Sequence, residues 1–184
     1  LIGDLPWPKA MRWGSIGYPF VRPIHWILAL FDGEVVPIEV AGIRSGDRTR
    51  THRFMAPEVR PLKSIQEYMD IMAKGFVIID QEERARIVEQ AVLNASETLS
   101  ATPLKDPELL STVANLVEFP FAVCGGFDEK FLDLPDAVLV TAMKEHQKYF
   151  SLYDRNGRLM PNFVAVNNTR PRDASCLLYT SDAA

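Results

Sequence analysis

The pattern of hydrophobic and polar positions in the first third of the chain indicates short strands. Residues 24–31 and 34–40 are rich in β-branched and aromatic side chains, and the pair Asp32-Gly33 separates them. An Asp-Gly pair between two such runs is a strong signal for a β-hairpin, because both residues tolerate the positive φ of a tight turn. A further short strand is expected over residues 51–54. This part of the chain is therefore predicted to be β-rich.

Four later segments carry helix signals. Ser64, with Glu67 three residues on, forms a capping-box pattern ahead of apolar residues at helical spacing. Asp80 begins a second apolar stripe, and Asp106 precedes a proline, which suits the first turn of a third helix. A fourth helix is expected over about residues 135–147, with an apolar face that includes His146.

The remaining elements are predicted to be strands. Residues 119–127 form an apolar run that ends near two glycines, and residues 149–153 and 159–166 flank the turn pair Asn156-Gly157. Pro161 predicts that its strand is an edge strand or is interrupted. This order of elements favours an α+β fold, with a mixed or antiparallel sheet and about four helices, over a doubly wound sheet.

Three domain segments are expected. Residues 1–19 contain prolines and glycines with tryptophans between them, which predicts an ordered connecting segment because tryptophans favour burial. Because the chain starts with Leu1 and not Met, this segment is expected to follow a preceding region. Residues 20–170 are predicted to form the α+β domain. Residues 171–184 are expected to be a disordered tail, and from about residue 175 the sequence resembles a translated sequencing adapter.

Composition and charge change this picture in one place. The net charge is −4, so the chain as a whole is not expected to bind a polyanion. Residues 43–60, however, hold five arginines against two carboxylates. Such a basic island suits phosphate contacts, while a solvated loop remains the alternative. Its arginines are Arg44, Arg48, Arg50, Arg53 and Arg60.

Other classes of protein are excluded by composition. Two cysteines and three dispersed histidines predict neither a disulfide framework nor a metal site, and no catalytic nucleophile with its base is visible. The longest apolar run, residues 24–31, is too short to span a bilayer, so no membrane partner is expected. A reducing, cytoplasmic location is the default.

Two clusters carry candidate chemistry. Lys144 and Lys148 are four residues apart, so on a helix they share a face where an anion would relieve their repulsion, although Glu145 could pair with Lys148 instead. His146 is expected to turn inward as a hydrogen-bonded core histidine. In the basic island, His52 lies between Arg50 and Arg53, and both residue types can bind phosphate. The candidate contacts are therefore Arg50, His52, Arg53, Lys144, His146 and Lys148.

A series of sequence blocks resembles a known family. The chain is similar to the N-terminal half of the β subunit of bacterial two-subunit glycyl-tRNA synthetases. Any one block would be a weak match, but their order and spacing make the resemblance specific. The blocks are residues 9–14, 20–26, 51–54, 80–84, 117–120, 143–150 and 163–168.

The resemblance implies an α2β2 enzyme that joins glycine to tRNA(Gly). In that family ATP and Mg are used on the α subunit, so no cofactor is expected on this chain. The expected partners are the α subunit, tRNA(Gly) and the rest of the β subunit. The resemblance also implies a fold related to the editing-type domain of phenylalanyl-tRNA synthetase.

Three functions are therefore open at this point. The leading hypothesis is a non-catalytic segment that supports tRNA binding and assembly of a tRNA ligase. A stand-alone editing-like hydrolase would need His52 or His146 to meet a carboxylate in one pocket. A plain RNA-binding module would need the arginines of the basic island for its salt-dependent affinity.

Overall fold

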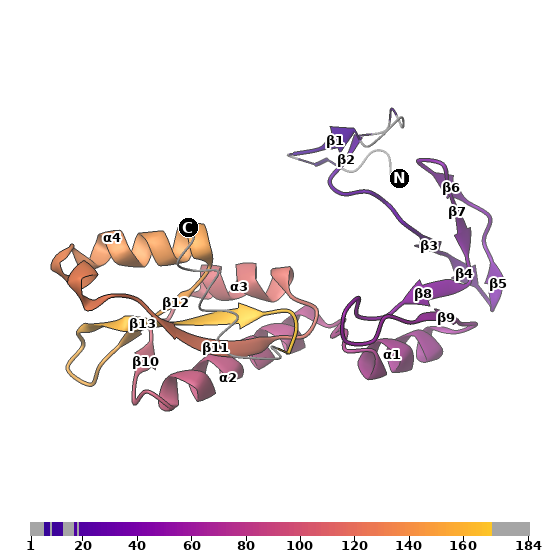
Figure 1. Cartoon of the computed structure of the whole chain (residues 1–184). Coiled ribbons are helices and arrows are strands. Elements are labelled where there is room, and N and C mark those ends of the chain that lie inside the picture. The colour runs from indigo at the N-terminus through magenta and orange to yellow at the C-terminus, as the bar shows by residue number, and fades with distance from the viewer. Residues whose placement is uncertain (1–5, 8, 13–16, 18, 171–184) are drawn as a thin grey trace. The chain divides into compact units, whose positions relative to one another are not determined.

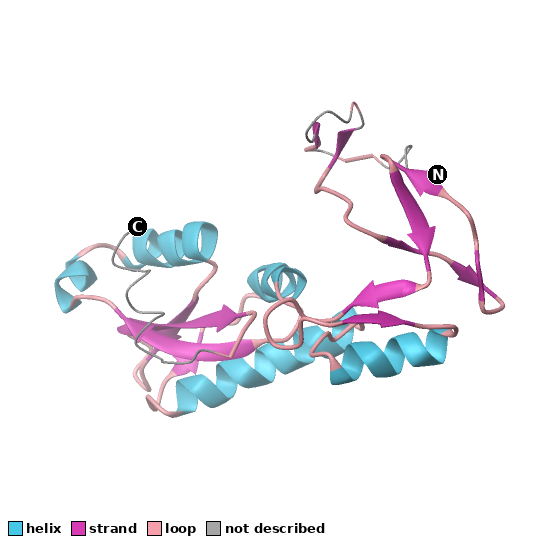
Figure 2. Ribbon diagram, turned by 45° about the vertical axis from the view of Figure 1, so that its right-hand side comes forward, coloured by secondary structure: helices cyan, strands magenta, loops and turns pink. Residues whose placement is uncertain are grey.

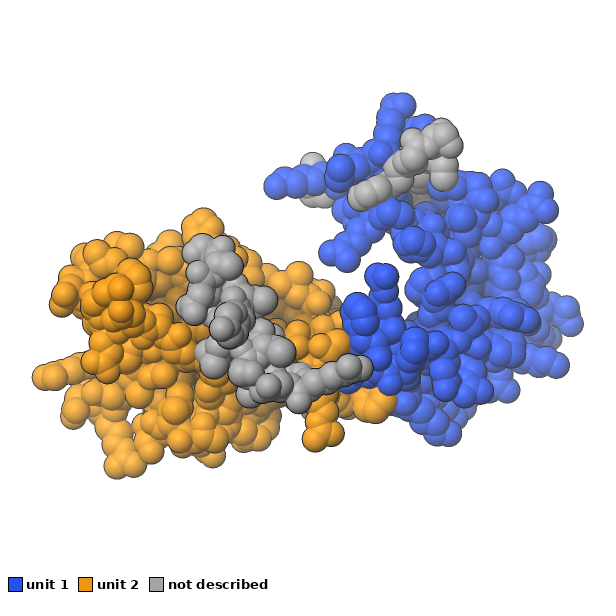
Figure 3. All heavy atoms as spheres, viewed as in Figure 1, with its two compact units in different colours: residues 1–75 blue, residues 76–184 orange. Residues whose placement is uncertain are grey.

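The structure is a computed structural model that describes residues 6, 7, 9–12, 17 and 19–170. It divides into two compact units, residues 1–75 and residues 76–184 (Figures 1 and 3). The fold class is α+β, as predicted from the sequence, with four α-helices among the described residues. The predicted tail, residues 171–184, lies outside the described residues, and the other predicted domain limits stay predictions.

Unit 1, residues 1–75, is built mainly from very short strands. They pair as two-stranded ribbons, except that β7 lies between β3 and β6, parallel to the first and antiparallel to the second. The described elements are β1 (Met11–Arg12), β2 (Pro19–Phe20), β3 (Ile27–Leu28), β4 (Leu30–Phe31), β5 (Glu34–Val35), β6 (Glu39–Val40), β7 (Ile43–Gly46), β8 (Arg48–Arg50), β9 (Val59–Pro61) and α1 (Ile65–Lys74).

The predicted Asp-Gly hairpin is confirmed. Asp32 and Gly33 have φ values of 48° and 80°, and Leu30 of β4 lies opposite Val35 of β5. The flanking runs do not continue as single strands, however. Their outer parts, β3 and β6, pair with β7 instead, so a long-range partner decided where each strand ends.

The strand predicted over residues 51–54 is wrong. The strand is β8, which ends at Arg50 and pairs with β9. After Arg50 the side chains of Thr51 and His52 hydrogen-bond to the backbone farther along the loop. Such local side-chain bonds replace ladder hydrogen bonds and favour a turn.

Unit 2, residues 76–184, contains a four-stranded antiparallel sheet in the order β10–β12–β13–β11. Figures 1 and 2 show α2 on one face of this sheet and α4 on the other. The elements are α2 (Gln81–Glu97), β10 (Thr102–Pro103), α3 (Pro107–Leu116), β11 (Phe121–Gly126), a 3₁₀ helix (Glu129–Asp133), α4 (Asp136–Thr141), a π-helix (Ala142–Gln147), β12 (Phe150–Tyr153) and β13 (Leu159–Asn167).

The two faces of the sheet follow the alternation of side chains along the strands. Phe150, Leu152 and Val164 join valines of α2 and α3 in the larger buried cluster. Phe163, which precedes Val164, joins Met143 in the second cluster beneath α4. Neighbouring residues on a strand point to opposite faces, so β12 and β13 each contribute to both clusters.

Three predicted helix starts are confirmed by their caps. Ser64 accepts a hydrogen bond from the backbone N–H of Glu67 at 3.2 Å, and Asp80 and Asp106 cap α2 and α3 in the same way. Glu67 reaches back to the N–H of Lys63 at 2.7 Å, one residue earlier than a standard capping box. Such caps satisfy N–H groups that the first helical turn leaves without partners.

The second predicted hairpin and the interrupted strand are also confirmed. Gly157 has φ 75° in the turn between β12 and β13, and Asp154 accepts from the backbone N–H groups of Asn156 and Arg158. β13 is not an edge strand, but its register against β12 shifts between the Ser151 and Tyr153 pairs, around Pro161. A proline removes one ladder donor, which fits this irregularity.

Candidate functional site

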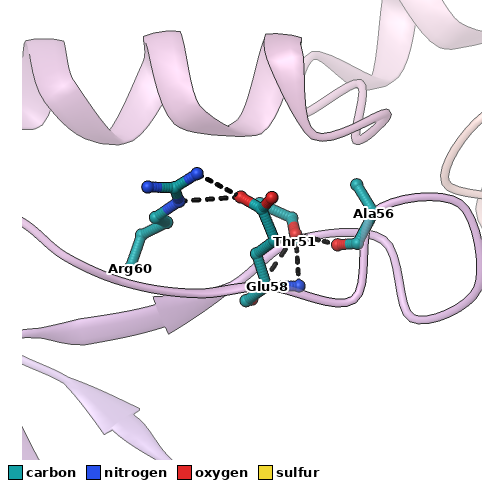
Figure 4. A network of polar contacts seen from close by, with 4 residues as sticks. All are labelled: Thr51, Ala56, Glu58 and Arg60. Atoms are coloured by element: carbon teal, nitrogen blue, oxygen red, sulfur yellow. Dashed lines mark hydrogen bonds and ion pairs between the residues drawn. The ribbon is translucent and has the colours of Figure 1, made fainter.

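The loop after β8 has a buried base. Thr51 is buried, and its hydroxyl donates to the carbonyl of Ala56 and accepts from the N–H of Glu58 at 3.2 Å (Figure 4). Its backbone N–H donates to the carbonyl of Glu58 at 3.2 Å. These bonds close the loop across Thr51 and Glu58, so the residues between them are presented by an ordered turn.

His52 shapes the same turn from beneath. Its side chain is fully buried, and Nδ1 accepts from the N–H groups of Phe54 and Met55, both at 3.2 Å. Its backbone N–H donates to the carbonyl of Gly75 at 2.9 Å, where α1 ends. A direct RNA contact by His52 stays a prediction, and the full burial of this side chain counts against it.

The structure separates the five arginines of the basic island into two groups. Three of them are paired with carboxylates: Arg44 Nε lies 2.9 Å from Glu39, Arg60 Nε lies 2.7 Å from Glu58, and Arg48 Nε lies 4.0 Å from Asp47. Within the described part of the chain, Arg50 and Arg53 have no carboxylate at ion-pair distance. The positive field at the surface of the island is therefore least compensated at Arg50 and Arg53.

Arg50 and Arg53 instead lie over aromatic rings. The guanidinium carbon of Arg50 is 5.5 Å from the ring centroid of Trp26, and that of Arg53 is 5.5 Å from the centroid of Phe54. Arginines stack on aromatic faces and keep their N–H groups available for phosphate. Both arginines are exposed, as the prediction of phosphate contacts requires.

The two rings were not identified as site residues from the sequence. Phe54 adjoins Arg53, so an aromatic residue next to an arginine was an available signal for it. Trp26 lies 24 positions before Arg50, and only the packing of β3 beside β8 brings them together. No local pattern reveals a pair of this kind.

Lys144 lies in unit 2 and forms ion pairs with two carboxylates. Its Nζ lies 2.8 Å from Asp106 Oδ2 and 2.8 Å from Glu108 Oε2, and its side chain is only 25% exposed. The hydrogen bonds to Asp106 and then Glu108 raise the pKa of Lys144. The anions that relieve the repulsion on Lys144 therefore come from the start of α3 in the same chain.

The prediction that His146 turns inward is wrong. The side chain is exposed rather than turned into the core. The α-helical spacing used for that prediction fails here because residues 142–147 form a π-helix, in which each residue turns through a smaller angle. Lys148 ends this segment with φ 59° and lies 3.7 Å from Glu145, the alternative that the sequence had left open.

The rest of this motif packs inside unit 2. The ring of Tyr149 stacks on Phe163 with centroids 4.3 Å apart and an interplanar angle of 2°. Phe163 in turn requires a glycine opposite it, because a Cβ on Gly125 would lie 2.4 Å from the Phe163 ring. Met143, Tyr149 and Phe150 therefore pack inside unit 2, and phosphate contacts by Lys144, His146 and Lys148 stay predictions.

The described residues include neither a metal-binding cluster nor a helix suited to span a membrane. Within them, no group of three His, Cys, Asp or Glu side chains is placed to hold a metal ion. His146 makes no hydrogen bond or ion pair with a carboxylate there, and the imidazole of His52 is enclosed. No helix in the same part of the chain combines the length and apolar character needed to cross a membrane.

The fold is α+β and carries exposed arginines after β8, and comparison with known proteins gives the family. Residues 1–178 match the model of the family described as glycyl-tRNA synthetase beta subunit. The chain therefore belongs to the glycyl-tRNA synthetase beta subunit family.

Relatives named glycine–tRNA ligase beta subunit are similar over nearly the whole chain. The protein of Syntrophus aciditrophicus is 49% identical over 173 residues, which is 94% of this chain and 25% of that relative. That of Desulfatibacillum aliphaticivorans is 46% identical over the same shares. That of Geobacter sulfurreducens is 43% identical over 97% of this chain and 26% of the relative. The chain thus spans about a quarter of the length of these relatives.

Proposed function

We propose that this chain is a non-catalytic segment of the β subunit of a glycine–tRNA ligase. In this proposal it supports the binding of tRNA(Gly) and the assembly of the enzyme. Family membership over residues 1–178 supports the assignment to the ligase. The observation that carries the RNA contact is the pair of exposed arginines, Arg50 and Arg53, which no described carboxylate neutralises.

The proposal includes the partners and chemistry expected for such an enzyme. Glycine activation with ATP and Mg would take place on an α subunit, while this segment would contact tRNA(Gly), the α subunit and the rest of the β subunit in the cytoplasm. A fold related to the editing-type domain of phenylalanyl-tRNA synthetase is part of the same proposal. The α+β architecture is compatible with that relationship.

The first experiment tests the assignment to the ligase. Glycylation of tRNA(Gly) is measured with the α subunit from the same genome, with and without the full-length β subunit that contains this segment. We expect glycylation to depend on the β subunit. Equal glycylation by the α subunit alone would contradict the proposed role.

The second experiment tests the arginines in the same full-length enzyme. The double variant Arg50→Ala, Arg53→Ala should raise KM for tRNA and leave kcat nearly unchanged. The slope of the logarithm of the association constant for tRNA against the logarithm of salt concentration should decrease in magnitude by about 0.7 to 0.9 for each arginine that contacts a phosphate. Arg44→Ala and Arg60→Ala are the matched controls, because both arginines are already paired with glutamates. An unaltered salt slope in the double variant would remove the basic island from the RNA interface.

A further inference from the structure

Arg50 and Arg53, the arginines of the basic island that no described carboxylate neutralises, each lie beside an aromatic ring that is open to solvent. Trp26 is 43% exposed although Arg50 lies over its ring, and Phe54 is 70% exposed beside Arg53. Large aromatic side chains are normally buried, where their area stabilises a core. An exposed arginine beside the ring distinguishes Trp26 and Phe54 from other exposed rings of unit 1 such as Phe31.

The backbone holds both rings in ordered positions. Trp26 directly precedes β3, which lies beside β8, and Arg50 ends β8 after the buried Thr49. Phe54 lies in the turn whose N–H groups are held by the buried His52 imidazole. Trp26 is therefore placed by the strand that follows it, and Phe54 by a hydrogen-bonded turn.

The chemistry of these pairs fits an unpaired nucleotide. A base that is not in a duplex exposes its faces, which stack on aromatic rings and on arginine guanidinium planes, and its phosphate accepts hydrogen bonds from arginine. A duplex offers the phosphates but hides the faces of its bases. The combination of ring and guanidinium therefore distinguishes single-stranded from double-stranded RNA.

We propose that Trp26 with Arg50, and Phe54 with Arg53, are two stacking sites for unpaired nucleotides of an RNA. This inference rests on the proposed function and adds which structural element of the RNA these residues recognise. At each site the ring takes the face of a base and the arginine takes the neighbouring phosphate. The loop fixed by Thr51 and His52 then serves as a scaffold for the second site.

The experiment compares how tightly the whole protein binds single-stranded and double-stranded RNA. Binding is measured to a single-stranded RNA that carries the fluorescent base 2-aminopurine and to a duplex with the same number of phosphates. Trp26→Leu and Phe54→Leu should each weaken single-strand binding roughly tenfold, within the range measured for the loss of one base–aromatic stack. Both variants should also reduce the quenching of 2-aminopurine and leave duplex binding unchanged.

The controls use exposed rings of the same unit that carry no arginine in the described structure. Phe31→Leu changes a ring at the β4–β5 hairpin, and Trp7→Leu changes a ring that packs edge-on against Phe20. Circular dichroism checks the fold of each variant. If a leucine variant fails to fold, Trp26→Phe and Phe54→Tyr replace it, and both should retain quenching because they keep a ring.

The outcomes separate the stacking sites from the proposed function. In one outcome, Arg50→Ala and Arg53→Ala weaken the binding of both single-stranded and duplex RNA, while the leucine variants behave like their controls. That result overturns the stacking sites and supports the RNA contact by arginine. If the arginine variants bind both RNAs as tightly as the wild type, the RNA contact itself is overturned. Selective loss of single-strand binding in Trp26→Leu and Phe54→Leu supports both the stacking sites and the RNA contact.

Discussion

At the scale of single residues, Asp106 joins two structural roles. One carboxylate oxygen accepts from the N–H of Leu109 at 2.9 Å and caps α3, while the other lies 2.8 Å from Lys144 Nζ. The hydrogen bond from Lys144, followed by that from Leu109, lowers the pKa of Asp106. Because the side chain is only 17% exposed, solvent screens this arrangement less than it screens the surface pairs of unit 1.

The lowered pKa of Asp106 predicts a pH dependence of stability. The carboxylate has a lower pKa in the folded chain than in the unfolded chain, so its contribution is complete above about pH 4 and is lost as pH falls through the folded pKa. Asp106→Asn keeps a capping oxygen but removes the charge. The free energy of unfolding, measured with urea, should differ between the two proteins at neutral pH and converge in acid.

Lys148→Met is the control for that measurement. Among the described residues Lys148 forms an ion pair with Glu145 alone, with Nζ 3.7 Å from Oε2, and both side chains are more exposed than that of Asp106. Its effect on the free energy of unfolding should be small, in the range of exposed helical pairs, about 0.3–0.5 kcal/mol or less. A difference between wild type and Asp106→Asn that stays constant from neutral to acid pH would contradict the assigned role of the Asp106 charge.

At the scale of elements, the end of α1 and the loop after β8 depend on each other. Gly75 is buried, ends α1 and accepts the backbone N–H of His52. A Cβ built at Gly75 would lie 2.4 Å from Thr51 Cγ2 and 2.8 Å from the carbonyl oxygen of Ile71. The close approach of the helix end to the loop base therefore requires glycine there, although φ is an ordinary −89°.

Gly75→Ala should lower the stability of unit 1 by about 1–3 kcal/mol, the usual cost of overpacking a close contact. It should also weaken RNA binding if Arg53 and Phe54 act from the loop, because Thr51 must move. Chemical denaturation followed by tryptophan fluorescence measures the first effect. Gly46→Ala is the matched control in the same unit, since a Cβ there meets nothing within 4 Å. Equal stability of the two variants would show that Thr51 can move away from the added Cβ at no cost in stability.

At the scale of the whole chain, the buried apolar side chains are unevenly shared. Of the buried hydrophobic residues described, only Leu62 and Met72 belong to unit 1, and the others form the two clusters of unit 2. Burial of apolar area is the main favourable term in folding. The described part of unit 1 is therefore held more by hydrogen bonds of loops and short ribbons than by a core.

Hydrogen exchange should reveal this difference. Backbone N–H groups of β3–β9 should exchange earlier than those of α2, β12 and β13, because local opening of unit 1 exposes less apolar surface. Mass spectrometry of peptides from residues 27–61, 81–97 and 150–167 measures both sets in one sample. Protection of the two sets to the same level would mean that the units open together.

Much of the fold was predictable from the sequence because its signals are local. Ser64, Asp80 and Asp106 were identified as caps because a capping oxygen bonds an N–H only two or three residues away. The Asp32-Gly33 turn was predictable because its two residues themselves adopt the positive φ of the hairpin. For the site, the same local reasoning selected Arg50 and Arg53, and it indicated the Glu145–Lys148 pair.

Only the tertiary structure decided which partner each side chain meets. The sequence by itself determined the family, the α+β class, the main helices and the basic island. It did not reveal that Asp106 neutralises Lys144, that a π-helix turns His146 outward, or that Trp26 lies under Arg50. Contacts between distant positions depend on how whole elements pack, and no spacing rule along the chain encodes them.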